Sequence, residues 1–200
     1  MKAAVGALDL AWLLVDARLM PMHIGVLQVF EAPVDPQTDW SEKWYEALRS
    51  QPVAVAPFNL RMHRRGLSWP QWEPVQDVDL GVHLQRWALP AAGNEAALHR
   101  LVGELHAEPL DLGRPLWEFH LIEGLADGGF ALYIKMHHAI VDGMGGMRLL
   151  QSALSEDAAV QATAPWSRNS ALARMPVIEP GTLDVRPRWC GPTGLQCHPV

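Results

Sequence analysis

The feature that most constrains this chain is the segment 130–143, in which an alternating strand runs directly into paired histidines and an Asp-Gly corner. Strand periodicity places alternate residues on opposite faces. One predicted face carries Phe130, Leu132, Ile134, Met136 and His138, and the other carries Ala131, Tyr133, Lys135 and His137. The first face is the more apolar, so His138 is predicted to point toward the core. Lost solvation there favours a neutral imidazole, which can act as a general base on a hydroxyl.

Structural roles for the same residues stay open. His138 can be a hydrogen-bonded core histidine, and His137 is interpreted as a strand residue that supports its neighbour. A metal site is not expected, because adjacent strand side chains point apart and no Cys or Glu lies at ligand spacing. Asp142 can orient an imidazole, or it can fix the Asp-Gly turn and start the following helix.

Composition narrows the class of protein. The chain has 200 residues, of which 49% are hydrophobic and 19% charged, so it can build one substantial core. A net charge of −6 without a basic run argues against nucleic-acid binding. The opening twenty residues lack a basic start and contain Asp9 and Asp16, so we do not expect a signal peptide. Both cysteines, Cys190 and Cys197, lie near the C-terminal end, and the expected location is cytoplasmic.

The coarse pattern predicts an α+β fold, a mainly antiparallel sheet with covering helices. We expect helices over 7–17, 39–49 and 144–157, with Asp39 as the cap of the second, and a further helix capped by Asn94. Expected strands cover 23–30, 116–122 and 130–138, the last two joined as a hairpin through 127–129. Six tryptophans can line an apolar channel, lie at a membrane interface or form core: Trp40, Trp44, Trp69, Trp72, Trp87 and Trp117. The other histidines, including His23, His83, His106 and His120, are interpreted as ordinary structural or surface residues.

The segment from His137 to Gly143 resembles the HHxxxDG motif of CoA-dependent acyltransferases, which several branches share. Other stretches resemble one branch, the bacterial wax ester synthase/diacylglycerol acyltransferase family. They are the PLW-like segment Pro115, Leu116 and Trp117, the opening Leu8-Asp9, and the stretches 21–25, 56–59 and 87–90. The resemblance is colinear from about Leu8 to Leu154.

That resemblance implies an O-acyltransferase that moves a long-chain acyl group from acyl-CoA to diacylglycerol or a long-chain alcohol. It assigns His138 as general base, His137 as its support and Asp142 as a structural or orienting residue, with Gly143, Pro115, Leu116 and Trp117 supporting the motif. Acyl-CoA is then a co-substrate, and no other cofactor or metal is expected. Lipid substrates further imply peripheral association with a membrane or lipid droplet.

Members of this family continue into a second domain that resembles the first. We expect the family's N-terminal domain over residues 1–160 and an irregular Pro/Gly/Arg-rich tail over 161–200, such as a frameshift would produce, in place of the second domain. Three hypotheses follow. The chain is a catalytic half that needs a second polypeptide or self-association, a catalytically inactive half-domain, or a condensation-type HHxxxDG domain.

Overall fold

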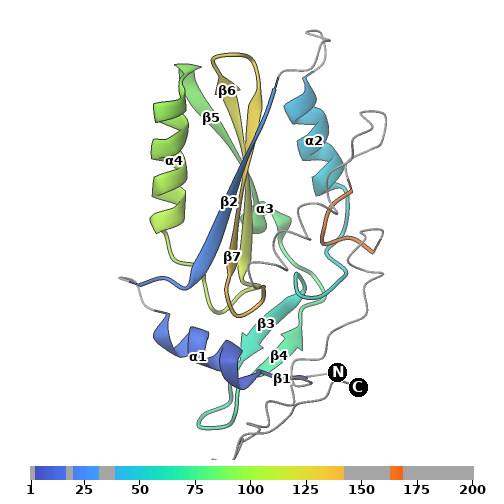
Figure 1. Cartoon of the computed structure of the whole chain (residues 1–200). Helices are drawn as coiled ribbons and strands as arrows, with labels where there is room; N and C mark the ends of the chain where they lie inside the picture. Colours follow the sequence, from blue (N-terminus) through green and yellow to red (C-terminus); the bar gives the residue numbers. More distant parts are fainter. Residues whose placement is uncertain (1–2, 17–19, 32–38, 142–162, 169–200) are drawn as a thin grey trace, which may run out of the picture.

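A computed structural model describes residues 3–16, 20–31, 39–141 and 163–168, and its centre is a four-stranded sheet in the order β2-β7-β6-β5 (Figure 1). The strands are β2 (His23–Phe30), β5 (Leu84–Gly93), β6 (Trp117–Leu125) and β7 (Phe130–His137). β7 pairs antiparallel with both β2 and β6, whereas β5 runs parallel to β6. The expected α+β class is confirmed, with one parallel pair that the sequence did not predict.

One helix covers each face of this sheet (Figure 1). α2 (Trp40–Arg49) begins after Asp39, whose carboxylate accepts the backbone N–H of Glu42 at 3.0 Å. α4 (Glu95–Ala107) begins after Asn94, whose side chain accepts the N–H of Ala97 at 2.9 Å. Both caps are the ones that the sequence predicts, because Asp and Asn satisfy donors that a helix start leaves unpaired.

The lower end of the sheet in Figure 1 carries α1 (Ala7–Val15) and a small second sheet. That sheet has the order β1-β4-β3, from β1 (Ala3–Ala4), β3 (Leu60–His63) and β4 (Gln71–Pro74), all antiparallel. A short helix, α3 (Leu80–His83), leads into β5. The sequence analysis missed β3, β4 and β5 because these strands are short or carry mixed polar residues without clean alternation.

Both faces of β7 are buried, which corrects the expectation that only one of them faces the core. Leu132, Ile134 and Met136 pack in the cluster under α2, and Tyr133 packs with Leu98 and Leu105 of α4. The more polar face of the strand is therefore covered by a helix, and Lys135 and His137 are buried with it.

The core also includes residues 163–168, which the sequence analysis had assigned to the tail. Trp166 is completely buried, stacks on Trp117 with ring centroids 5.1 Å apart, and donates its indole N–H to the carbonyl of Gln51. This part of the chain therefore lies in the domain core. The expected helix over 144–157 and the remaining tail, with Cys190 and Cys197, lie outside the described residues.

The tryptophans proposed as channel lining divide by environment. Trp117 is fully buried, Trp72 is nearly so, and both are core residues. Trp40 and Trp44 are partly buried on α2, and Trp69 and Trp87 are exposed.

Candidate active site

Strand pairing brings the PLW segment beside the paired histidines. Trp117 lies opposite Met136 in the β6–β7 ladder, and the carbonyl of Leu116 accepts the backbone N–H of His137 at 3.0 Å. The Trp117 indole donates to the carbonyl of Phe58 at 2.8 Å, so the 56–59 stretch joins the same cluster. Pro115 extends it toward β3 through a bridge to Arg61. Segments that are far apart in the sequence therefore support one short piece of β7.

The sequence predicted His138 as the last residue on a buried strand face. In the structure it lies just beyond the end of β7 and is only partly buried. Its backbone N–H donates to the carbonyl of Met22 at 2.8 Å, which fixes the turn against the start of β2. Its ring stacks on Trp12 of α1, with centroids 4.3 Å apart and planes inclined at 28°. The imidazole thus has one packed face and retains access to solvent.

His137 is the buried member of the pair. Its Nδ1 accepts the backbone N–H of Ala139 at 3.0 Å, so in the neutral ring the proton sits on Nε2. That Nε2 lies 3.7 Å from Oδ2 of Asp16, which is too long for a hydrogen bond. Burial lowers the pKa of His137, and the Asp16 carboxylate offsets part of this effect. His137 is accordingly held neutral in one tautomer.

α1 supplies two carboxylates that the sequence analysis did not assign to the site. Asp16, at the C-terminal end of α1, accepts the N–H of Met22 at 2.7 Å through Oδ1. Burial raises the pKa of Asp9, while a hydrogen bond with the backbone of Gly6 and the charge of His138 lower it. Asp9, Trp12 and Asp16 recur at helical spacing, which would have placed them on one face. In the sequence, Asp9 belongs to the Leu8-Asp9 resemblance and both acids interrupt an apolar run, but neither is assigned to the site.

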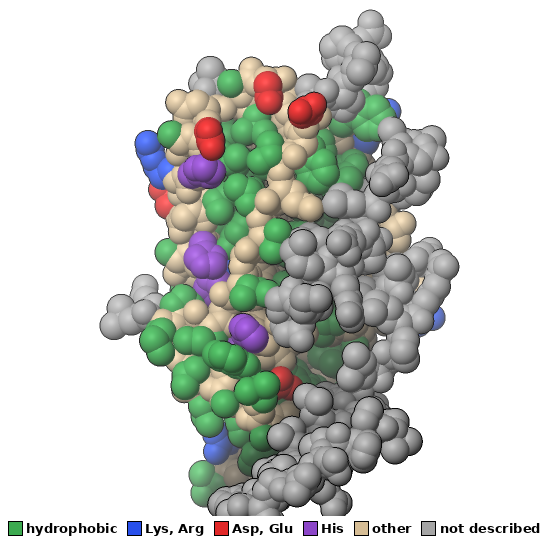
Figure 2. Space-filling model, in the orientation of Figure 1, with side chains coloured by type: hydrophobic (Ala, Val, Ile, Leu, Met, Phe, Trp, Pro, Cys, Tyr) green, Lys and Arg blue, Asp and Glu red, His purple; other side chains and the backbone are tan. Residues whose placement is uncertain are grey.

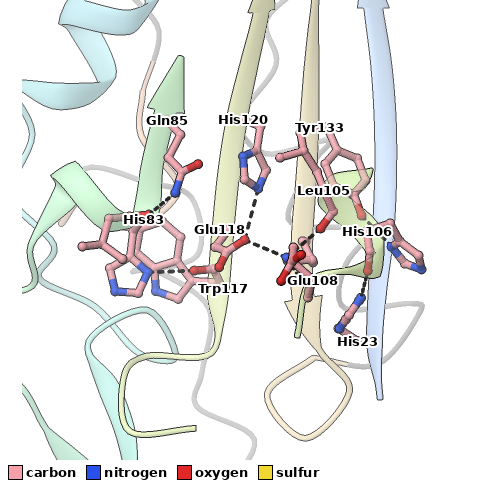
Figure 3. Close-up of polar contacts among 12 residues, drawn as sticks. His23, His83, Gln85, Leu105, His106, Glu108, Trp117, Glu118, His120 and Tyr133 are labelled. Carbon is pink, nitrogen blue, oxygen red and sulfur yellow. Dashed lines mark hydrogen bonds and ion pairs between the residues drawn. The ribbon is translucent and has the colours of Figure 1, made fainter. Parts of the chain in front are cut away.

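Under α4, the face of the sheet holds a buried polar network (Figure 3). The ammonium group of Lys135 donates to the carbonyls of Leu105 and Glu108 at 2.9 and 3.0 Å, and contacts Oε2 of Glu118 at 2.7 Å. All three donors of the lysine are therefore satisfied, two of them by carbonyls at the end of α4. Although burial raises it, hydrogen bonds from His120 and Lys135 hold the pKa of Glu118 below its ordinary value.

Histidines continue the network toward the paired motif. His23 lies directly opposite His137 in the β2–β7 ladder, and its Nε2–H donates to the carbonyl of His106 at 2.7 Å. His106 Nδ1 in turn pairs with the hydroxyl of Tyr133 at 2.6 Å. The Tyr133 ring fits because residue 25 is glycine, since a Cβ there would lie 2.5 Å from the hydroxyl oxygen. These histidines are structural, as predicted, but they form one connected set.

The other two residues of the motif, Asp142 and Gly143, lie outside the described residues. Within 3–16, 20–31, 39–141 and 163–168, no group of three or more His, Cys, Asp or Glu side chains is arranged to hold a metal ion.

Comparison with known proteins decides the family. The model of the wax ester synthase/diacylglycerol acyltransferase catalytic domain matches residues 5–178. The chain belongs to this family. The match includes the histidine pair, the PLW segment and residues 163–168, and it extends past the boundary that the sequence analysis drew at 160.

The wax ester synthase/diacylglycerol acyltransferase relatives are considerably longer than this chain. A Mycobacterium tuberculosis protein named as a diacylglycerol O-acyltransferase is 42% identical over 154 residues, which cover 75% of this chain and 34% of that protein. A second protein of the same organism, Tgs4, is 32% identical over 188 residues, which cover 94% of this chain and 39% of its own length. The chain therefore spans about a third of the length of the curated relatives it matches.

Solved structures agree on the fold. The wax ester synthase/diacylglycerol acyltransferase from Marinobacter aquaeolei VT8 superposes with a TM-score of 0.76 at 37% identity, covering 82% of this chain and 41% of that one. The first condensation domain of the calcium-dependent antibiotic synthetase gives a TM-score of 0.59 at 18% identity, covering 76% of this chain and 37% of that domain. The second match shows a shared fold alone. None of the helices in the described ranges has the length and apolar character needed to cross a membrane.

Proposed function

We propose that this chain carries the general base of an acyl-CoA-dependent O-acyltransferase that forms triacylglycerol or wax esters. The observation that carries the proposal is the contrast within the histidine pair. His137 is buried and held in one tautomer, whereas His138 is partly accessible against Trp12. A general base must be held within hydrogen-bond reach of the substrate proton, and an oriented, accessible imidazole is suited to that role.

In the proposed reaction, a ring nitrogen of His138 accepts the proton of the acceptor hydroxyl while the oxygen attacks the thioester carbonyl. A C–O bond forms, the C–S bond breaks, and the proton passes from His138 to the departing CoA sulfur, which leaves as the free thiol. The acceptor is diacylglycerol or a long-chain alcohol, and no covalent acyl-enzyme is formed. A base of this kind contributes about 10²- to 10⁴-fold to the rate.

In this proposal the surrounding residues position the imidazole of His138. Trp12 fixes one face of the imidazole, and the carbonyl of Met22 holds its backbone. Asp9, whose pKa responds to the charge of His138, is placed to favour the imidazolium that forms during the reaction. Asp142 and Gly143 are proposed to form the turn that follows, with Asp142 as an orienting residue.

The coverage of the relatives favours a second candidate. The chain matches about a third of the relatives' length. Acyl transfer by this chain is therefore proposed to need a second polypeptide or a second copy, which would supply the other wall of the substrate channel. The alternative is a catalytically inactive half-domain that retains the motif. The condensation-type alternative is weaker, since those structures share 16–20% identity against 37% for the wax ester synthase.

The experiment measures CoA release from palmitoyl-CoA, with hexadecanol or diacylglycerol as acceptor, for the wild type and for His138→Ala. His99→Ala is the matched control, because His99 lies exposed on α4 away from the site. We expect His138→Ala to lose about 10²-fold or more of the turnover and His99→Ala to retain it. Equal turnover in His138→Ala would contradict the proposal, and no turnover in any of the three folded proteins would favour the inactive half-domain.

A further inference from the structure

His138, the accessible histidine of the pair, is held by two segments from the start of the chain. Its backbone N–H donates to the carbonyl of Met22, just before β2, at 2.8 Å. Its ring stacks on Trp12 of α1, with centroids 4.3 Å apart. Figure 2 shows histidine side chains reaching the surface above the hydrophobic side chains of α1. The position of the His138 imidazole therefore depends on how α1 and the start of β2 are placed relative to each other.

Asp16 joins those two segments. It directly follows the last residue of α1, and its Oδ1 accepts the backbone N–H of Met22 at 2.7 Å. This length is typical of a charge-assisted hydrogen bond to a carboxylate. The backbone N–H of Asp16 donates to the carbonyl of Trp12 at 3.0 Å, so the two residues are one helical turn apart. One residue thus ties the helix that packs on the His138 ring to the segment that holds the His138 backbone.

The second carboxylate oxygen of Asp16 faces the buried histidine. Oδ2 lies 3.7 Å from Nε2 of His137, and this nitrogen has no hydrogen-bond partner in the part of the chain that the structure describes. Burial lowers the pKa of His23, which lies opposite His137 on β2, and the charge of Asp16 opposes that shift. The Asp16 side chain is itself only 9% exposed. A carboxylate is therefore buried where α1, β2 and β7 meet, beside both histidines of the motif.

We propose that Asp16 is a positioning residue for the general base, and that its hydrogen bond to Met22 sets where the His138 ring lies. This inference rests on the proposed function, which gives His138 the role of the base. Without the hydrogen bond, Trp12 and Met22 are no longer tied together, and the ring that they hold loses its fixed position. A general base acts only within hydrogen-bond reach of the proton that it accepts, and a displacement of about 1 Å can cost about 10²-fold in rate. Asp16 acts through His138 and not on the substrate.

The test separates the hydrogen bond of Asp16 from its charge. Asp16→Ala removes both, whereas Asp16→Asn keeps an oxygen that can accept the N–H of Met22. The ring-proton chemical shifts of His138 report its position, because the stacked indole of Trp12 displaces them upfield. His138→Ala assigns these signals, and Trp12→Leu gives their values without the indole. The spectra are recorded on the full chain and need no substrate.

Asp39→Ala is the matched control for a general loss of stability. Oδ1 of Asp39 accepts the backbone N–H of Glu42 at 3.0 Å, which is a bond of the same kind. Asp39 caps α2, and Trp44 of that helix packs on Phe130, at the opposite end of β7 from the histidine pair. Asp16→Ser, whose hydroxyl reaches one bond less far than the carboxylate, replaces Asp16→Ala if that variant does not fold.

We expect Asp16→Ala to move the His138 ring shifts most of the way to their values in Trp12→Leu. Asp16→Asn and Asp39→Ala should both stay near the wild type. In the palmitoyl-CoA assay, kcat of Asp16→Ala should fall by about 10²-fold with little change in KM.

The proposal is overturned if Asp16→Ala retains the wild-type ring shifts, or if Asp39→Ala moves them as far. It is also overturned if Asp16→Asn moves them as far as Asp16→Ala does, because the charge and not the hydrogen bond to Met22 would then hold His138. The shifts decide between these outcomes whether or not the chain turns over. The proposed function is tested separately, by the turnover of His138→Ala.

Discussion

Among single residues, Asp16 offers the most direct test of how the histidine pair is held. Its Oδ2 lies 3.7 Å from Nε2 of His137, and its Oδ1 accepts the N–H of Met22, whose carbonyl holds His138. The carboxylate raises the pKa of His137 against the effect of burial. Asp16→Asn should therefore move the protonation midpoint of His137 to lower pH, as measured by ring ¹⁵N shifts. Asp16→Ala should also destabilise the fold by about 1–3 kcal/mol, since it leaves the Met22 donor unpaired.

Asp77→Asn is the control for this residue, because Asp77 is exposed and distant from the motif in the sequence. It should leave the ring shifts of His137 and the unfolding free energy as in the wild type. An unchanged His137 titration in Asp16→Asn would show that Asp16 acts on the backbone alone.

The sequence located the two histidines but not their environments. Alternation along β7 correctly separates His137 from His138, yet it assumes that only one face of the strand is covered. α4 covers the other face at Tyr133 and Lys135, and His137 is buried near Asp16 at the end of α1. The strand ends at His137, one residue before His138. Helix packing of this kind depends on residues far away in the sequence, and local periodicity does not report it.

Among the secondary-structure elements, the end of α4 depends on one buried lysine. Lys135 donates to the carbonyls of Leu105 and Glu108 and neutralises Glu118. Lys135→Met keeps the apolar stem but leaves two carbonyls and a carboxylate without their partner. We expect a loss of about 3–5 kcal/mol in urea unfolding, as for removal of one member of a buried ion pair. Adding Glu118→Gln to this variant should cost less than the sum of the two single changes.

Lys43→Met is the matched control, because Lys43 is exposed on α2, above the ring of Trp40. It should change the unfolding free energy by less than about 1 kcal/mol. If Lys135→Met unfolds at the same urea concentration as Lys43→Met, the carbonyls of α4 are satisfied in another way.

The elements themselves were predictable where a local signal was strong. α2 and α4 have capping residues at their starts, and β2, β6 and β7 are dense in apolar residues. β5 contains Gln85, Arg86 and Pro90, and its strand conformation depends on parallel pairing with β6. Trp166 follows Pro165 at the start of a stretch that reads as irregular, although its indole fills the core beside Trp117. These features are set by tertiary contacts.

For the whole molecule, four histidines with lowered pKa values, three of them buried and His106 exposed, determine how stability depends on pH. Burial is the largest effect on the pKa of His23, His83, His106 and His137, and it lowers each from the ordinary 6.5. As pH falls through 6.5, the unfolded chain takes up protons that the folded chain does not, so stability decreases. Glu118, with a pKa lowered from 4.5, adds a further loss in more acidic solution. Asp9, whose pKa is raised, opposes this loss of stability only in acidic solution, where carboxyl groups become protonated.

Thermal unfolding measured from about pH 8 to about pH 5 should therefore show a melting temperature that is level above about pH 7.5 and falls below it. His83→Gln provides the comparison. His83 donates through Nδ1 to the carbonyl of Trp117 at 2.7 Å, and an amide N–H offers a similar donor that does not titrate. The variant should show a shallower fall with pH even if it is less stable throughout. A melting temperature that stays level down to about pH 5.5 would mean that these histidines take up protons as readily in the fold as in the unfolded chain, so burial would not hold them neutral.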